Sequence, residues 1–365
     1  MSEQSDRFAR GRGSQIRPAN RFGGPTYEDD FEHIESDPEA LDDHLAALRN
    51  LSTEYLPDHS RSVVSRNDSP DIPFMYSLNP YRGCQHGCSY CYARPTHEFL
   101  GFDAGLDFEA KILVKEAAPG LLRAFLSRPA WTPEPIVMSG VTDPYQPGER
   151  RFRLTRRCLE VMAEFRQPAS IITKNALIVR DRDLLGRLAS DRLVHVNLSL
   201  TTLDAGLCRS MEPRTSTPPA RLRAIRALAD AGVPVRVMIA PVIPGLNDSE
   251  IPAILRASRD AGARAAGYQM LRLPLAVAPI FREWLAREQP GRQRKVEQRL
   301  RAMRDGRLNS VEFGKRMQGE GEIANQIGNV FRLFARKFGL DGGLPPHETA
   351  LFRRPVAGSD QLRFF

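Results

Sequence analysis

The chain has 365 residues, which is enough to bury a full hydrophobic core and more than most single domains contain unless they are barrels with appendages. Its apolar fraction of 41% and charged fraction of 26% are ordinary for a soluble globular protein. It contains no run of 18 apolar residues, and the N-terminus lacks the apolar segment of a signal peptide. We therefore expect a cytoplasmic protein with no membrane partner. The net charge of +8 is compatible with a polyanionic partner but does not require one.

The first 55 residues differ in composition from the rest. Residues 1–27 are rich in Gly, Arg and Ser, whereas residues 28–43 carry nine carboxylates and no Lys or Arg. Such a composition buries too little apolar surface to offset the entropy of ordering. We predict that residues 1–55 are a largely disordered or loosely draped arm. It is either a solvated tail or a basic arm that contacts nucleic acid.

From Phe74 onward the sequence alternates between short apolar runs and amphipathic segments. Such runs are typical of buried parallel strands. The predicted strands are 74–78, 136–140, 170–173, 194–200, 235–240 and 267–271. Amphipathic helices fit between them, and Thr155 is expected to cap one of these helices. The alternation predicts an α/β fold with a parallel sheet over residues 56–275. Residues 111–115 could form a further strand whose place the sequence does not give.

After residue 275 the alternation stops, and residues 279–338 are predicted to be helical. We expect residues 276–365 to form a helical, basic C-terminal extension and tail. Between Arg282 and Arg316 there are eleven Lys or Arg residues and five Asp or Glu residues. This segment is either a phosphate-contacting surface or a solvated helical face.

Three of the five cysteines lie close together, and their odd number argues against a disulfide framework. Cys84, Cys88 and Cys91 form a C-x3-C-x2-C motif, with Tyr90 directly before the last cysteine. Thiolates bind soft metals, which means zinc or an iron–sulfur cluster. A zinc site would need a fourth ligand, for which His86 or His97 is available. The remaining alternative is that three cysteines lie near each other by chance.

The other two cysteines lie among apolar residues. Cys158 falls on the apolar face of a predicted helix, and Cys208 is near Leu207 and Met211. Free cysteine commonly behaves as a small buried hydrophobic residue. We therefore predict that neither is catalytic.

Four stretches resemble the radical S-adenosylmethionine (SAM) superfamily, in its spore photoproduct lyase-like (DNA repair photolyase-like) branch. They are NPYRGCQHGCSYCYARP, TDPYQP, TKN and LTT followed by MEPRT, and the resemblance spans about residues 60–275. It implies a partial (βα)6 TIM-type barrel with the cysteine loop at the carboxyl ends of the strands. It also implies a [4Fe–4S] cluster bound by Cys84, Cys88 and Cys91, with one iron left open for SAM. Reductive cleavage of SAM would give a 5′-deoxyadenosyl radical that abstracts hydrogen, with an electron donor such as flavodoxin or ferredoxin.

The same resemblance implies which residues contact SAM; most of them lie near the end of a predicted strand, whereas Tyr90 lies in the cysteine loop and Arg214 just before a predicted helix at Thr217. Tyr90 occupies the position of a common aromatic residue, and Val242 or Ile243 would pack against adenine. The polar candidates are Thr142 and Asp143 for the SAM ammonium, Lys174 for its carboxylate, Ser199 for the carboxylate or a ribose hydroxyl, and Arg214 as a further polar contact. Without the resemblance, TDPYQP would be a tight turn, and Lys174 and Ser199 an ordinary surface lysine and buried serine.

One position departs from the branch. The spore enzyme returns hydrogen from a cysteine at the end of its second strand, whereas this chain has VMSGVTD there, with Gly140 in place of the thiol. A fold can carry over the radical generator without carrying over the substrate. Three functions stay open: a radical SAM enzyme acting on nucleic acid, one acting on a protein or small molecule, and a zinc-binding nucleic-acid-binding module.

Overall fold

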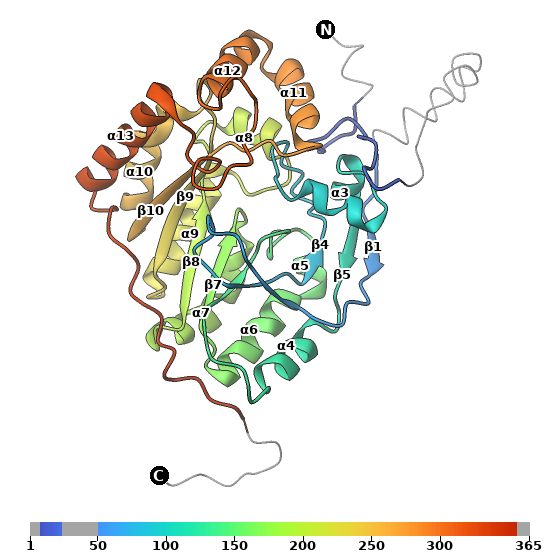
Figure 1. Ribbon diagram of the computed structural model, residues 1–365. Coiled ribbons are helices and arrows are strands. Elements are labelled where there is room, and N and C mark those ends of the chain that lie inside the picture. The colour runs from blue at the N-terminus through green and yellow to red at the C-terminus, as the bar shows by residue number, and fades with distance from the viewer. Residues whose placement is uncertain (1–7, 24–49, 356–365) are drawn as a thin grey trace.

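The computed structural model describes residues 8–23 and 50–355. Its centre is a curved seven-stranded sheet (Figure 1). In spatial order the strands are β10 (Ala265–Met270), β9 (Val235–Val242), β8 (Val194–Ser199), β7 (Ala169–Thr173), β6 (Ile136–Met138), β3 (Tyr76–Leu78) and β2 (Val64–Arg66). All neighbours pair in parallel except β2, which is antiparallel to β3. The six parallel strands are those predicted, and the partial barrel is confirmed.

Strand β8 shows how the sequence separates the two faces of the sheet. Val194, Val196 and Leu198 belong to the main apolar core, which the helices cover. The alternate residues are polar and point into the barrel, where Asn197 Nδ2 donates to Ser170 Oγ at 3.0 Å. The barrel interior is therefore a polar surface, while the hydrophobic core lies between the sheet and its helices.

Five of the helices that pack outside the sheet lie between consecutive strands of the chain, and the sixth comes after the last strand. They are α4 (Ala118–Leu126), α6 (Leu154–Phe165), α7 (Arg182–Ser190), α9 (Pro218–Asp230), α10 (Ile251–Asp260) and α13 (Gly321–Lys337). Thr155 lies inside the first turn of α6 rather than at its cap, and its hydroxyl donates to the Pro144 carbonyl at 2.5 Å. The prediction of a Thr155 cap was therefore wrong.

A smaller sheet lies beside the barrel and contains the strand that was predicted at 111–115. It contains β1 (Glu54–Pro57), β5 (Lys111–Val114) and β4 (Tyr81–Arg82). The remaining α-helices in the described ranges are α3 (Leu106–Ala110), α5 (Glu149–Phe152), α8 (Ala205–Met211), α11 (Val277–Glu288) and α12 (Pro290–Ala302). None of the described helices is both long and apolar enough to cross a membrane.

The C-terminal part packs against the barrel at several places. Helix α13 contributes Phe331, whose ring lies 4.6 Å from that of Tyr268 on β10, and so occupies the place of a sixth barrel helix. Further on, the His347 ring stacks on His195 with centroids 3.8 Å apart, and His347 Nε2 lies 3.0 Å from the Ala169 carbonyl oxygen. The C-terminal segment therefore crosses the amino ends of β7 and β8, and packing is continuous across residue 275.

The N-terminal arm was predicted to be largely disordered, and for residues 8–23 this is wrong. Ala9, Arg12 and Ser14 are buried, because the segment packs on the loop that carries the cysteines. Residues 1–7 and 24–49 of the predicted arm, and 356–365 of the predicted tail, lie outside the described residues.

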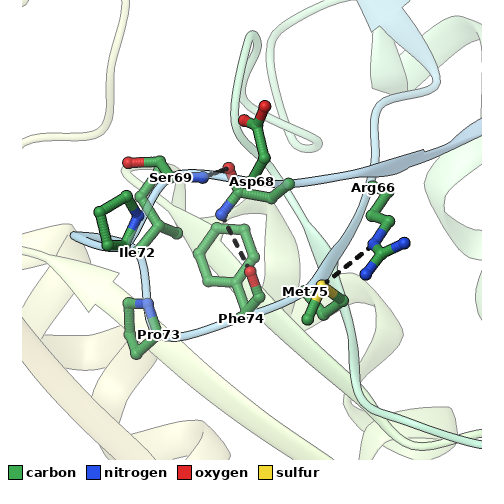
Figure 2. A pocket seen from close by; sticks show the side chains of 9 residues that line it. Arg66, Asp68, Ser69, Ile72, Pro73, Phe74 and Met75 are labelled. Carbon is green, nitrogen blue, oxygen red and sulfur yellow. Dashed lines mark hydrogen bonds between the residues drawn. The ribbon is translucent and has the colours of Figure 1, made fainter.

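The loop between β2 and β3 encloses a pocket of about 650 Å³ (Figure 2). Its lining is Arg66, Asn67, Asp68, Ser69, Pro70, Ile72, Pro73, Phe74 and Met75, so it contains no residue of the cysteine loop. Asp71 of the same loop accepts a hydrogen bond from Arg316 Nε at 2.5 Å. The Met270 N–H of β10 in turn donates to the Met317 carbonyl at 3.0 Å. These contacts link β2 and β10, the two unpaired edges of the barrel.

Candidate metal centre and cofactor site

The three motif cysteines lie in the loop that follows β3 and β4. The Cys84 N–H donates to the Phe108 carbonyl at 2.9 Å, and the Cys91 N–H donates to the Cys88 carbonyl at 3.2 Å. Cys84 and Cys88 are each 7% exposed. Cys91 packs against both of the apolar clusters that contain them, one with Phe108 and the other with Tyr90. The loop thus brings three thiols together in a mostly buried place.

A buried arginine fixes the backbone of this loop. Arg94 donates from Nε and Nη2 to the Cys88 carbonyl at 3.0 and 2.8 Å. Its Nη2 also pairs with Glu109 Oε1 at 2.5 Å, and both side chains of the pair have no exposed surface. Since a buried ion pair requires close geometry and further hydrogen bonds, Arg94 and Glu109 hold the loop in one conformation.

The thiols fit a metal group that carries positive charge. Burial raises the pKa of Cys88, and burial together with the Cys84 thiol raises the pKa of Cys91 to about 11. Metal coordination stabilises thiolates that burial would otherwise disfavour. Within residues 8–23 and 50–355, no group of three or more His, Cys, Asp or Glu is placed to bind one metal ion. The three-thiol donor set suits an iron–sulfur cluster, in which each cysteine binds a different iron.

Both histidines considered as a fourth zinc ligand have partners, although His97 Nδ1 is buried without a hydrogen bond to any described residue. His97 Nε2 lies 3.0 Å from the Lys111 carbonyl oxygen, and its ring packs edge-on against Phe108. His86 Nδ1 lies 3.3 Å from Asp143 Oδ2, and His86 Nε2 lies 3.1 Å from Asn175 Nδ2. Both rings therefore have structural partners, which weakens the zinc alternative.

Asp143 joins the cysteine loop to the barrel. It accepts from Thr173 Oγ1 at 2.7 Å and from the Lys174 N–H at 2.8 Å, both at the end of β7. Burial alone would lower the pKa of His86, but Asp143 and the Cys84 thiol raise it to about 10. In the same pair, burial opposes ionisation of Asp143, yet His86 keeps its pKa below the usual value. The pair is therefore charged at neutral pH.

Glu212 is the centre of a second buried network, at the carboxyl ends of β7 and β8. It accepts from the Tyr90 hydroxyl, from Arg221, and from Thr201 Oγ1 at 2.7 Å. Lys174 Nζ lies 3.2 Å from Glu212 Oε1. Burial opposes ionisation of Glu212, but Arg221 and Lys174 lower its pKa below the usual range. Sequence reasoning missed Glu212, since in MEPRT it considered only Arg214.

Comparison with known proteins decides the family. The sequence model of the radical SAM superfamily matches residues 78–257. An uncharacterized protein of Methanocaldococcus jannaschii is 33% identical over 201 residues, which cover 55% of this chain and 72% of that protein. The chain belongs to the radical SAM superfamily.

Other relatives and structures agree with this assignment. An uncharacterized protein of Mycobacterium tuberculosis is 41% identical over 221 residues, covering 60% of this chain and 65% of the relative, slightly under two thirds of its length. Among solved structures, spore photoproduct lyase with bound AdoMet and dinucleoside spore photoproduct has a TM-score of 0.57 at 16% identity. That match covers 90% of this chain and 86% of the other. At this identity it establishes a shared fold.

The fold places most of the predicted SAM contacts of this radical SAM chain around the cysteine loop, and several already have protein partners. Thr142 donates from Oγ1 to the Gly83 carbonyl at 2.7 Å, directly beside Cys84. Lys174 Nζ donates to the Ala240 carbonyl at 2.9 Å as well as pairing with Glu212. Ser199 is buried at the end of β8, and its carbonyl accepts from Arg221 at 3.0 Å. Thr142 therefore supports the loop, while Lys174 would have to exchange a partner to bind SAM.

Two other predicted contacts point elsewhere. Arg214 donates from Nε to the Gly11 carbonyl at 2.9 Å, so it binds the N-terminal segment. Val242 belongs to the main core between sheet and helices, whereas its neighbour Ile243 belongs to the cluster that contains Cys88 and Tyr90. Ile243, just past the end of β9, is thus the one of the two that belongs to the same apolar cluster as Cys88 and Tyr90.

The remaining cysteines lie as expected, although one has a polar neighbourhood. Cys158, on α6, is fully buried in the hydrophobic core between the sheet and its helices. Cys208 Sγ is 3.8 Å from Glu212 Oε2 and 3.6 Å from Arg221 Nη2. Gly140 has a φ of +129°, a conformation that glycine adopts readily, and the nearest side-chain atom to a Cβ built there would be Asn79 Nδ2 at 3.5 Å.

Proposed function

We propose that this chain is a cytoplasmic radical SAM enzyme in which Cys84, Cys88 and Cys91 hold a [4Fe–4S] cluster and the barrel mouth binds SAM. The observation that carries the proposal is a buried C-x3-C-x2-C loop at the carboxyl edge of a partial barrel, inside the stretch that matches the family. When bound and reduced by a donor such as flavodoxin or ferredoxin, the cluster and SAM supply a 5′-deoxyadenosyl radical for hydrogen abstraction.

The protein's own residues contribute binding and placement. Lys174 has an ammonium group that suits the SAM carboxylate, and Tyr90 and Ile243 belong to the buried apolar cluster next to the cysteine loop. Asp143 fixes His86 and the end of β7, so its role is to position the loop. Glu212 holds Tyr90 and Lys174 in place by accepting from both.

The substrate we favour is a nucleic acid. The protein carries a net charge of +8. A pocket of about 450 Å³ lies between α12 and the loop after β9, lined by Gly245, Leu246, Asp248, Ser249, Arg292, Lys295 and Arg299. Asp248 pairs with Arg299 at 3.1 Å, which leaves an excess of two positive charges in the lining. The related fold of spore photoproduct lyase, which is described with a bound dinucleoside spore photoproduct, supports the same substrate class.

A specific observation favours a second candidate. The resemblance to the spore photoproduct lyase branch implies that Gly140, in the loop after β6, occupies the position of that enzyme's hydrogen-donating cysteine, and no cysteine lies between Met138 and Glu149. Reversal of a thymine lesion by that route therefore lacks its donor. A radical SAM enzyme acting on a protein or small molecule is the alternative.

Two measurements test these proposals. Anaerobic reconstitution should yield iron and sulfide in equal amounts and release 5′-deoxyadenosine from SAM with dithionite, whereas one zinc and intact SAM would refute the enzyme proposal. Oligonucleotide binding should weaken steeply with salt, and the triple variant Arg292→Ala, Lys295→Ala, Arg299→Ala should reduce the slope of log K against log salt by about two to three units for duplex DNA. Oligonucleotide binding that changes neither with salt concentration nor with these substitutions would favour the second candidate.

A further inference from the structure

The N-terminal segment lies directly against the backbone of the cysteine loop. Gly13 is so close to Gly87 that a Cβ built on Gly13 would lie 1.6 Å from the Gly87 carbonyl oxygen and 3.2 Å from the Ser89 nitrogen. Gly87 and Ser89 flank Cys88. No residue except glycine fits at position 13 without displacing one of the two segments, since real Cβ atoms do not approach a backbone so closely.

A buried carboxylate joins the two segments. Glu109 accepts from the Gly13 N–H through Oε2 at 2.9 Å and from the Ser14 N–H through Oε1 at 2.8 Å. The same carboxylate pairs with Arg94, whose guanidinium donates twice to the Cys88 carbonyl. An unbroken chain of hydrogen bonds therefore runs from Gly13 through Glu109 and Arg94 to Cys88.

Arg12 anchors the segment on its other side. Its Nη1 donates to the Glu109 carbonyl at 2.6 Å, and its Nη2 donates to the Leu51 carbonyl at 2.8 Å. Arg12 is 4% exposed. Burial disfavours its charged form and lowers its pKa to about 10. Gln15 closes the local turn by donating to the carbonyls of Ala9 and Arg12 at 3.1 and 3.0 Å. A flexible tail would not bury an arginine in this way.

Two further contacts extend the attachment. Arg214 donates to the Gly11 carbonyl at 2.9 Å, and the Arg214 N–H donates to the His86 carbonyl at 3.3 Å. Arg17 pairs with Asp103 and Asp107 at 2.7 and 2.8 Å, on the segment after the cysteine loop. The segment therefore touches the cysteine loop and the elements that support it.

We propose that residues 9–17, here called the N-terminal strap, are part of the metal centre: they hold the cysteine loop in its binding conformation and shield it from solvent. The inference rests on the proposed function for the identity of the metal group. Its mechanical part, that the strap orders residues 83–97, does not depend on any metal.

The experiment uses the full chain and the variant Gly13→Ala, with Gly120→Ala as the matched control. Gly120 lies in α4, and a Cβ built there meets nothing within 4 Å. In the metal-free protein, amide hydrogen exchange of residues 83–97 should be about tenfold faster in Gly13→Ala, because hydrogen bonds to a buried carboxylate are lost. After reconstitution, the same variant should lose iron and visible absorbance in air faster than the wild type, and Gly120→Ala should match the wild type.

The exchange rates of residues 8–23 and 83–97 together decide whether the strap orders the cysteine loop. Faster exchange across residues 8–23 with unchanged exchange across 83–97 would overturn the proposal, because the strap would be released without effect on the loop. If Gly13→Ala fails to fold, Arg12→Ala removes the anchor without creating a clash, and the same comparison applies to it. A wild type that takes up no iron would refute the proposed function while the exchange result still tests the strap.

Discussion

Arg221 and Glu212 form an ion pair in which both side chains are almost completely buried, at 1% and 0% exposure, directly beside the Tyr90 hydroxyl. The pair joins α9 to the end of α8 and, through Tyr90, to the cysteine loop. Removing one member leaves the other charged and buried without a counter-charge, which is the costly way to break such a pair.

Replacing Glu212→Gln should therefore lower the free energy of unfolding by about 3–5 kcal/mol. Urea denaturation at neutral pH measures it. Glu160→Gln is the control, since Glu160 pairs with Arg156 at 3.1 Å but is 52% exposed. The control should change stability by less than about 0.5 kcal/mol. Equal effects of the two substitutions would contradict the role assigned to Glu212.

The cysteines divide into two groups with opposite expected behaviour. Replacing Cys84, Cys88 or Cys91 by Ala should abolish cluster assembly and SAM cleavage, because each supplies one thiolate of the donor set. Cys158→Ala, in the core, should keep the wild-type iron content at a cost of about 1–2 kcal/mol in stability. Iron and sulfide analysis separates the groups, and full SAM cleavage in a Cys84, Cys88 or Cys91 variant would refute the assignment.

Val242 and Ile243 allow a test of which side chain meets SAM. Ile243→Ala should weaken SAM binding by about tenfold, since loss of buried aliphatic contact costs on the order of 1–2 kcal/mol. Val242→Ala should leave SAM affinity within about twofold and lower stability by about 1–3 kcal/mol, because Val242 belongs to the core. Isothermal titration with the reconstituted protein distinguishes them. The reverse pattern would restore Val242 as the contact.

His195 and His347 predict a loss of stability in acid. Burial, followed by the neighbouring His347 and Arg236, lowers the pKa of His195 from 6.5 to about 4. Because the folded state binds the proton less readily than the unfolded state, this stabilisation is present above pH 6.5 and is lost as the pH falls toward 4. Through this shift, His195 should lower the free energy of unfolding at pH 5 by about 2 kcal/mol relative to neutral pH.

Hydrogen exchange of residues 343–352 at pH 7.5 and pH 5, corrected for intrinsic rates, should show the C-terminal segment opening in acid. In the variant His195→Gln the difference between the two pH values should shrink. A wild-type segment equally protected at both pH values would contradict the prediction.

The strands of the barrel could be predicted because their signals are local. Runs such as IVMSG and VHVNLSL are apolar wherever helices cover a strand, so the existence of the strands could be predicted from pattern, whereas the partial barrel was implied by the family resemblance. Glu212 gave no such signal, because the partner that makes it a buried anion, Arg221, lies nine residues further along the chain, and the phenol of Tyr90 is 122 residues away. The composition of residues 11–14 also led to a wrong prediction. Glycine and arginine are typical of disordered segments, but here Gly13 lies close to the cysteine loop and donates to Glu109, 96 positions along the chain.

The link between Asp71 and Arg316 has a consequence for how the barrel is closed. Elsewhere around the barrel wall, neighbouring strands are joined by ladders of backbone hydrogen bonds, which fix their spacing near 4.8 Å. Between β2 and β10, the described contacts are side-chain bonds and loop backbone instead. The side chains of Arg316 and Asp71 are 14% and 6% exposed, so this pair is more costly to break than a surface ion pair. The described barrel wall is therefore closed along this seam by a mostly buried ion pair and loop backbone instead of a strand ladder.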